Sequence, residues 1–171
     1  FAFFHPSMPD EPLIFVEVAL TAGVPNSIAA LLDEDLEPMN PAQAKAAVFY
    51  SISNCQKGLA GISFGNLLIK QVVAELSLEL PRLETFVTLS PIPRLMQWLA
   101  TQSLESNAPK RGASDDDDSY LKNLAAHYLL CAKRADGKPY DPVAQFQLGN
   151  RAEVYDIHAG ADKSETGLAQ S

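Results

Sequence analysis

The sequence predicts an α+β fold in which a mixed β-sheet is flanked by helices. Three observations support this fold class. Runs rich in aromatic and β-branched residues, typical of strands, alternate with stretches whose apolar residues recur at helical spacing. In the centre of the chain, a glycine-rich loop joins a strand to a helix, and a further strand follows. The chain has 171 residues, 47% of them hydrophobic, so we expect one domain with a substantial core.

The first expected elements are strands. Two apolar runs, Phe1 to Phe4 and Leu13 to Leu20, are separated by a proline-rich stretch that is typical of a loop. We therefore expect a hairpin or a neighbouring pair of strands. After them, Ile28 to Leu32 predicts a short helix that is capped by Asn26 or Ser27.

The centre of the chain predicts the order strand, loop, helix, strand. Ala46 to Ser53 shows little alternation of apolar and polar residues, which indicates a strand buried on both faces. The loop from Gly58 to Asn66 contains three glycines and leads into Leu67 to Leu80, whose apolar residues have helical spacing. Pro81 ends this helix, and Glu84 to Leu89 predicts the next strand.

The last part of the chain is expected to be mixed. Leu95 to Leu104 and Tyr120 to Lys133 predict helices, and the acidic stretch between them, Ser106 to Ser119, predicts a solvated loop. Val143 to Leu148 and Ala152 to His158 then suggest a hairpin. We expect the residues from Ala159 onward to form a polar tail.

Composition argues against several classes of protein. The net charge of −8 offers no basic patch for a nucleic acid or an anionic membrane. Cys55 and Cys131 are far apart and belong to no Cys/His cluster, so we expect neither a disulfide nor a metal site, and a cytoplasmic location fits best. No apolar run approaches the ~20 residues that span a bilayer. Because the first residue is Phe1, we expect a chain cut from a longer one.

The loop from Gly58 to Asn66 has the properties of an anion-binding site. Glycines let backbone N–H groups approach a phosphate, and the start of the following helix adds unpaired donors and a favourable dipole. The loop lacks the residues of a Walker motif and the spacing of a Rossmann motif. A pyrophosphate site and a tight turn without any ligand therefore both stay open at this point.

Six segments of the chain resemble, in order, stretches of the malonyl-CoA decarboxylases. They are His5-Pro6-Ser7 with Glu11-Pro12-Leu13, Ala47 to Ser53, Gln56 to Gly61, Phe64 to Lys70, Leu89-Ser90-Pro91-Ile92-Pro93, and Asp141-Pro142-Val143-Ala144. The string from Leu89 to Pro93 is the most distinctive. The resemblance implies an acetyltransferase-like (GNAT-like) catalytic domain that follows a helical domain. Residues 1–171 would then be an incomplete catalytic domain without the helical one, through which copies of the chain could associate.

The resemblance also implies a reaction, the decarboxylation of malonyl-CoA to acetyl-CoA and CO₂ in fatty-acid metabolism. No cofactor is required, because the thioester of coenzyme A (CoA) accepts the electrons that the departing CO₂ leaves behind. Ser90 is the catalytic serine by this resemblance, and Ser51 lines the same pocket. The loop that contacts the CoA ester consists of Ala60, Gly61, Ile62, Ser63, Phe64, Gly65 and Asn66. Without the family, Ser90 would be interpreted as a hydroxyl that caps the helix after Pro93.

The second catalytic residue of the family is a histidine, and Gln147 stands at its position. A glutamine amide donates hydrogen bonds but does not titrate near neutral pH. The sequence also has Arg94 and Arg151 where the family usually has glycine. His158 is a candidate to replace the missing imidazole, although a surface histidine is the simpler interpretation, and we expect His127 to serve packing or to face solvent.

Three functions stay open at this point. The chain is a lyase that acts on malonyl-CoA, a catalytically weakened homologue that still binds an acyl-CoA, or an acyl-CoA N-acyltransferase of the same fold. The residue at position 147 favours the second of these, because it removes the proton donor of the family. The expected partners are malonyl-CoA and acetyl-CoA, with no nucleic acid and no membrane.

Overall fold

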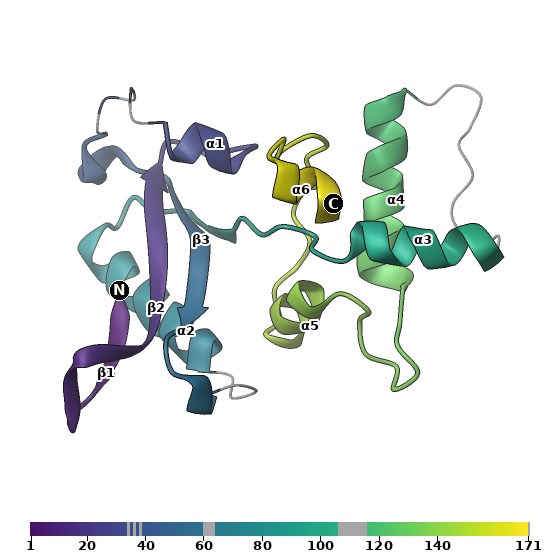
Figure 1. The fold of residues 1–171 in the computed structure, drawn as a ribbon. Coiled ribbons are helices and arrows are strands. Elements are labelled where there is room, and N and C mark those ends of the chain that lie inside the picture. The colour runs from purple at the N-terminus through teal and green to yellow at the C-terminus, as the bar shows by residue number, and fades with distance from the viewer. Residues whose placement is uncertain (34, 36, 38, 60–63, 106–115, 171) are drawn as a thin grey trace. The chain divides into compact units, whose positions relative to one another are not determined.

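The computed structural model describes residues 1–33, 35, 37, 39–59, 64–105 and 116–170 (Figure 1). The chain divides into two compact units, Phe1–Leu89 and Ser90–Ser171, which we describe one after the other as unit 1 and unit 2. Unit 1 contains a β-sheet and helices, and the described part of unit 2 is built from helices and loops. The expected α+β composition with a mixed sheet is confirmed, whereas the expectation of a single domain stays a prediction.

The sheet of unit 1 has four strands in the order β1-β2-β3-β4. Their bounds are β1 (Ala2–His5), β2 (Met8–Thr21), β3 (Ala46–Asn54) and β4 (Thr85–Thr88). β2 pairs with β1 and with β3 in antiparallel fashion, and β3 pairs with β4 in parallel. The parallel pair follows from the predicted order strand, helix, strand, because a helical crossover returns the chain to the same end of the sheet.

The predicted hairpin is confirmed, but its loop is shorter than expected. β2 already begins at Met8, so most of the proline-rich stretch is strand. Proline has no N–H for a strand ladder and is tolerated where a strand is paired on one side only. That condition holds for Pro9 and Pro12, because β2 pairs with β3 only from Ile14 onward. The pairing with β1 is also irregular there, with register shifts on both sides of Phe4.

The helices of unit 1 agree with their predicted positions. The short helix α1 (Ile28–Leu31) is capped by the hydroxyl of Ser27, which accepts from the N–H of Ala30. The helix α2 (Phe64–Glu79) begins slightly earlier than predicted and ends before Pro81. Two single 3₁₀ turns, η1 (Pro41–Gln43) and η2 (Lys57–Leu59), precede β3 and α2. Gly58 therefore lies in η2, and Gly65 and Asn66 lie in α2, where the sequence predicted a loop.

One face of the sheet packs against α2 and forms the core of unit 1. The buried side chains of this core are all apolar and come from β2, β3 and α2: Ile14, Val16, Ala47, Phe49, Leu68, Val72 and Leu76. The three helical members are four residues apart, so they form one stripe on α2. The apolar period that predicted this helix thus also identifies its buried face.

Unit 2 contains four helices in its described part: α3 (Leu95–Glu105), α4 (Asp117–Cys131), α5 (Pro142–Gly149) and α6 (Glu165–Gln170). Figure 1 shows α4 running across α3. Their contact is a second core cluster formed by Leu95, Trp98, Leu124, Ala125, Tyr128 and Ala132. A turn follows α4 and is closed by an isolated bridge between Lys133 and Pro139.

The hairpin predicted near the end of the chain is wrong. Val143 to Leu148 lies inside α5, and Ala152 to His158 has no regular secondary structure. The segment was ambiguous because six residues are too few to distinguish strand alternation from a buried helix. The deciding signal was Asp141-Pro142, since an acidic cap followed by proline starts helices.

Two further predictions need correction. The predicted loop from Ser106 to Ser119 is too long, because α4 begins at Asp117 and Asp116 caps it by accepting from the N–H of Ser119 at 2.7 Å. Residues 106–115 lie outside the described residues. The predicted polar tail contains α6, which contacts α3.

Candidate functional site

Ser90 lies at the start of the loop that connects β4 to α3, and its side chain is half-buried. The cap role considered from the sequence is wrong. Helix α3 begins at Leu95, and the N–H of Trp98 donates to the carbonyl of Arg94, which places the N-cap at Arg94 rather than at Ser90. The hydroxyl of Ser90 therefore does not cap the N-terminus of α3.

Gln147 lies on α5, and its amide meets the hydroxyl of Ser90. The Nε2 atom of Gln147 donates to Oγ of Ser90 at 3.4 Å, and both side chains are partly buried. The two residues are far apart in the sequence, so only the folding of unit 2 brings them together. This distance is at the long end of the hydrogen-bond range, so a small shift of either residue would break the contact.

Both ends of α5 are well fixed, which determines where Gln147 lies. At the N-terminus, Oδ1 of Asp141 accepts from the N–H groups of Val143 at 2.8 Å and Ala144 at 2.9 Å. At the C-terminus, the N–H of Ala152 donates to the carbonyl of Gln147, and Arg151 donates to Leu148. These two bonds form a Schellman motif, in which the second donor adopts a left-handed conformation.

Arg151 occupies that left-handed position, with φ of 68°. A side chain is strained there, and glycine is the residue that helix ends usually place at this point. The family resemblance implies glycine at this position, where this chain has Arg151. The structure supplies the physical reason for that preference.

The histidines of unit 2 have other contacts. The ring of His127 packs against Trp98, with 6.0 Å between the ring centroids, which agrees with the first of its two expected roles, packing or facing solvent. His158 lies in the irregular segment after α5, where its Nδ1 is 3.9 Å from Oδ2 of Asp156. Its role as a replacement for the missing imidazole stays a prediction.

The remaining candidates lie in unit 1. Ser51 is a half-buried residue of β3 that pairs with Glu17 of β2. The register shifts directly after this pair, so that Tyr50 is an extra residue in β3 and forms a β-bulge. The parallel pairing of β3 with β4 ends at Phe49, so Ser51 lies beyond the part of β3 that β4 covers.

The expected CoA-binding loop is described only in part. Gly65 and Asn66 form the first turn of α2, where Gly65 is buried and Asn66 is half-buried. Phe64 is the first residue of that helix. Ala60, Gly61, Ile62 and Ser63 lie outside the described residues. The binding of CoA at this segment stays a prediction.

Similarity to known proteins shows which family the chain belongs to. The family model for the malonyl-CoA decarboxylase C-terminal domain matches residues 1–119 and 107–171. The chain belongs to the malonyl-CoA decarboxylase family. Curated relatives include the mitochondrial malonyl-CoA decarboxylases of Anser anser anser, 35% identical over 209 residues, and Mus musculus, 33% identical over 212 residues. Both alignments cover 99% of this chain but 41% and 42% of the relatives, so the chain spans about two fifths of their length.

Solved structures of the family have the same fold. The malonyl-CoA decarboxylase from Rhodopseudomonas palustris is 48% identical with a TM-score of 0.87, and the alignment covers 99% of this chain and 43% of that one. The malonyl-CoA decarboxylase from Agrobacterium vitis is 43% identical with a TM-score of 0.89, and the alignment covers 99% and 47%. The resemblance inferred from sequence motifs is thereby confirmed.

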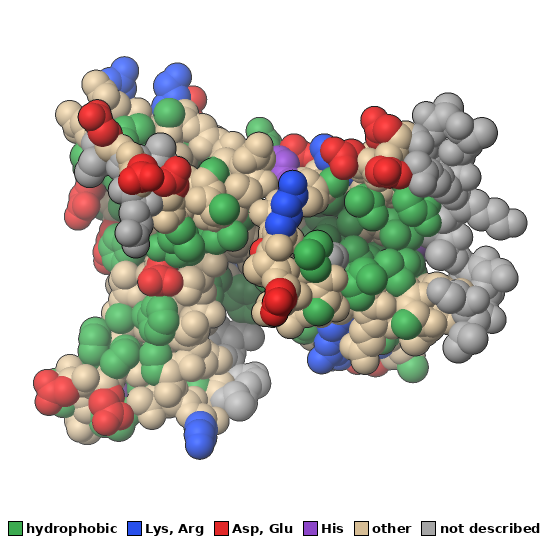
Figure 2. Space-filling view, turned by 45° about the horizontal axis from the view of Figure 1, so that its top comes forward, with side chains coloured by type: hydrophobic (Ala, Val, Ile, Leu, Met, Phe, Trp, Pro, Cys, Tyr) green, Lys and Arg blue, Asp and Glu red, His purple; other side chains and the backbone are tan. Residues whose placement is uncertain are grey.

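Three observations, on membrane spans, metal sites and basic patches, concern the described residues only. Within the described ranges, no helix is long and apolar enough to cross a membrane. The same residues contain no cluster of three or more His, Cys, Asp or Glu side chains that could hold a metal ion. On the face drawn in Figure 2, the described Lys and Arg side chains do not gather into one broad patch.

Proposed function

We propose that this chain is the catalytic part of a malonyl-CoA decarboxylase that converts malonyl-CoA to acetyl-CoA and CO₂. The observation that carries the proposal is the contact between Gln147 and Ser90. These are the two positions at which the family resemblance locates the catalytic pair, and they come from separate segments of the chain. Membership of the family supports the substrate and the reaction.

The chemistry requires a hydrogen-bond donor at the thioester oxygen. Breaking the bond between the carboxylate carbon and the neighbouring carbon releases CO₂ and leaves an electron pair on a carbon next to the thioester. The resulting enolate places negative charge on the thioester oxygen, which a positioned donor stabilises. Because Gln147 donates to Oγ of Ser90, the hydroxyl proton of Ser90 points elsewhere and is free to bind that oxygen.

The enolate carbon then needs a proton. Gln147 does not supply it, since an amide does not titrate near neutral pH. Water or another side chain must deliver the proton after CO₂ has left. We therefore expect decarboxylation to proceed slowly, with the final protonation as the weak step of the cycle.

We also propose that the sheet of unit 1 is acetyltransferase-like and binds CoA at the start of α2. Three features of this unit support the assignment: the order strand, helix, strand with a parallel pair, the bulge at Tyr50, and the helix α2, whose first turn contains Gly65 and Asn66 of the expected CoA-binding loop. Ligands of such sheets bind at the carboxyl ends of the parallel strands. No cofactor is needed in this proposal, since the thioester is its own electron acceptor.

A cytoplasmic location agrees with the state of the cysteines. Cys55 and Cys131 are both free thiols and both exposed. Such thiols persist in a reducing compartment, whereas they would oxidise in a secreted protein. The proposal makes malonyl-CoA the principal partner of the chain.

Replacing Ser90 by alanine tests the proposed activity. In the full-length protein, Ser90→Ala should lower the rate of CO₂ release from malonyl-CoA by about 10²-fold or more, because one positioned donor is lost. The melting temperature should stay close to that of the wild type, since Ser90 does not cap α3. The matched control is Ser77→Ala, which removes an exposed hydroxyl from α2. A normal rate for Ser90→Ala would refute the role of this hydroxyl.

A catalytically weakened homologue that only binds acyl-CoA is the second candidate, and Gln147 is the observation that favours it. Gln147→His restores a titratable group and should raise turnover by about 10²- to 10⁴-fold, with little change in CoA affinity. The rate should then acquire a limb near pH ~6.5, the ordinary pKa of histidine. Rates measured from about pH 5 to 9 check this. A wild type as fast as Gln147→His would show that another residue carries the proton.

A further inference from the structure

A buried polar contact joins α4 to the start of α5. The hydroxyl of Tyr128 donates to Oδ2 of Asp141 at 3.1 Å. Tyr128 is 0% exposed and Asp141 is 1% exposed, so the bond is fully shielded from water. A buried carboxylate is costly unless its oxygens are bonded, which makes this arrangement informative.

Both oxygens of Asp141 are in use. Oδ1 accepts the two N–H groups that begin α5, and Oδ2 accepts from Tyr128. Helix α5 has only eight residues, and isolated helices shorter than about 12 residues are marginal in water. Its position therefore depends on contacts such as this one rather than on its own stability.

The same tyrosine also supports the segment that follows Ser90. Its ring contacts Trp98 of α3, with 5.1 Å between the ring centroids, and belongs to the same core cluster as Leu95. Ile92, two residues after Ser90, packs against this cluster. Tyr128 thus connects the serine segment, through α3, with the helix that carries Gln147.

We propose that Tyr128 and Asp141 are positioning residues for the decarboxylase site, whose hydrogen bond holds α5 where the Gln147 amide reaches the Ser90 hydroxyl. The inference rests on the proposed function for its effect on rate. The amide and the hydroxyl are 3.4 Å apart, close to the limit of a hydrogen bond, so a displacement of α5 by a few tenths of an ångström would separate them. Displacements of about 1 Å in a site can cost about 10²-fold in rate.

The tyrosine is well suited to be a permanent donor. Burial, and next the negative charge of Asp141, raise the pKa of the Tyr128 hydroxyl well above its ordinary value of 10. The phenol therefore stays protonated throughout the neutral range and keeps the hydrogen that it donates to Asp141.

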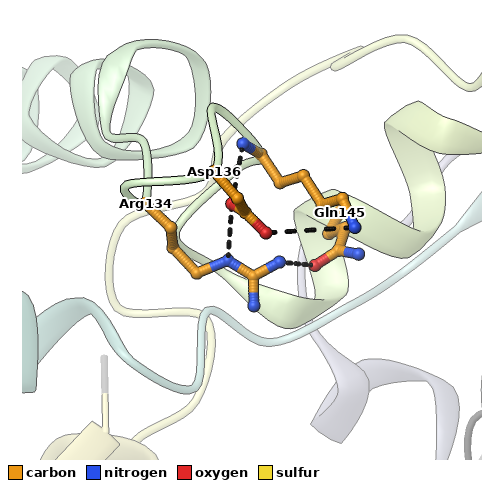
Figure 3. Close-up of polar contacts among 4 residues, drawn as sticks. Arg134, Asp136 and Gln145 are labelled. Atoms are coloured by element: carbon orange, nitrogen blue, oxygen red, sulfur yellow. Dashed lines mark hydrogen bonds and ion pairs between the residues drawn. The ribbon is translucent and has the colours of Figure 1, made fainter.

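Gln145 of α5 makes an exposed contact that provides a control. The guanidinium of Arg134 donates to Oε1 of Gln145 and lies 3.6 Å from Asp136, which also pairs with Lys138 (Figure 3). Exposed ion pairs of this kind contribute about 0 to 1 kcal/mol. Gln145→Ala removes the contact to α5 without touching the buried bond, so it should leave the rate close to that of the wild type.

Tyr128→Phe tests the inference, because it keeps the ring and removes the hydroxyl. In the full-length protein we expect the maximal rate of CO₂ release to fall by about 10- to 100-fold with little change in KM. In a Gln147→Ala background, the same substitution should cause no further loss. A merely structural role predicts the same relative loss in both backgrounds, together with a proportional fall in folded protein, and that result would overturn the inference.

Two further measurements keep the test decisive. If Tyr128→Phe does not fold, Asp141→Asn replaces it, since its amide still caps α5 and can donate to the oxygen of Tyr128. That variant should retain most of the rate, and a loss as large as that of Ser90→Ala would contradict a positioning role.

A wild type that releases no CO₂ would refute the proposed function alone. The positioning inference is then tested by the NMR signal of the Gln147 side-chain amide. That signal should shift in Tyr128→Phe as it does in Ser90→Ala, and an unchanged signal in Tyr128→Phe would refute it.

Discussion

The cores of the two units are built from different kinds of side chain. In unit 1, the buried residues between the sheet and α2 are aliphatic or phenylalanine, without a polar atom among their side chains. In unit 2, the cluster contains Trp98 and Tyr128, and the tyrosine is bonded to the buried carboxylate of Asp141. Apolar packing therefore organises the first unit, whereas the second also depends on one directional polar contact.

This difference has consequences for precision and for robustness. An apolar core accepts small shifts of its members, because dispersion and burial have little directional preference. A buried hydrogen bond specifies a geometry, and the loss of either partner leaves the other without a substitute. The unit that holds Ser90 and Gln147 is the one with the directional contact, which agrees with the needs of a catalytic site.

The largest expected effect on stability is in unit 1. Phe49→Ala removes a side chain that is 1% exposed from the centre of the core, and should lower the free energy of unfolding by about 3 to 5 kcal/mol. Urea unfolding followed by circular dichroism measures this. The control is Leu78→Ala on α2, where the leucine is 85% exposed, with an expected change within about 0.5 kcal/mol. Equal losses for the two variants would contradict the assigned core.

A smaller loss is expected from the polar contact of unit 2. Asp141→Ala removes the cap of α5, worth about 0.5 to 2 kcal/mol, and leaves the Tyr128 hydroxyl buried without its acceptor, at a cost of about 1 to 3 kcal/mol. The same unfolding experiment applies. The exposed cap of α4 offers the comparison, because Asp116→Ala should cost only about 1 kcal/mol. A loss for Asp141→Ala no larger than that for Asp116→Ala would show that the buried bond adds no stability.

The smallest expected effect is a gain. Arg151→Gly relieves the left-handed backbone at the end of α5 and should stabilise the protein by about 1 kcal/mol. Lys133→Gly, which has no such conformation to relieve, should not stabilise. Thermal unfolding compares the two variants. A lower melting temperature for Arg151→Gly would mean that the arginine side chain has contacts that outweigh the strain.

The candidate site was predictable from the sequence in part. Motif resemblance identified Ser90 and Gln147 as individual positions, but their hydrogen bond depends on the fold of α5, for which the sequence predicted a strand. The helix was missed because Val143 to Leu148 alternates apolar and polar residues as a strand would. The sequence offered Asp141 only as part of a family motif and predicted no role for Tyr128, because the contact between these two residues depends on burial, which no local pattern reveals.

The sequence by itself determined the family, the elements of unit 1 and the face that α2 buries. In each case the signal is local: a motif, an apolar period or a cap that acts within a few residues. Only the tertiary structure decided the start of β2, the helical state of α5 and the meeting of Gln147 with Ser90. The start of β2 depends on the pairing of Met8 with His5 of β1. The other two features depend on contacts between separate segments of unit 2, such as the hydrogen bond from the hydroxyl of Tyr128 to the carboxylate of Asp141.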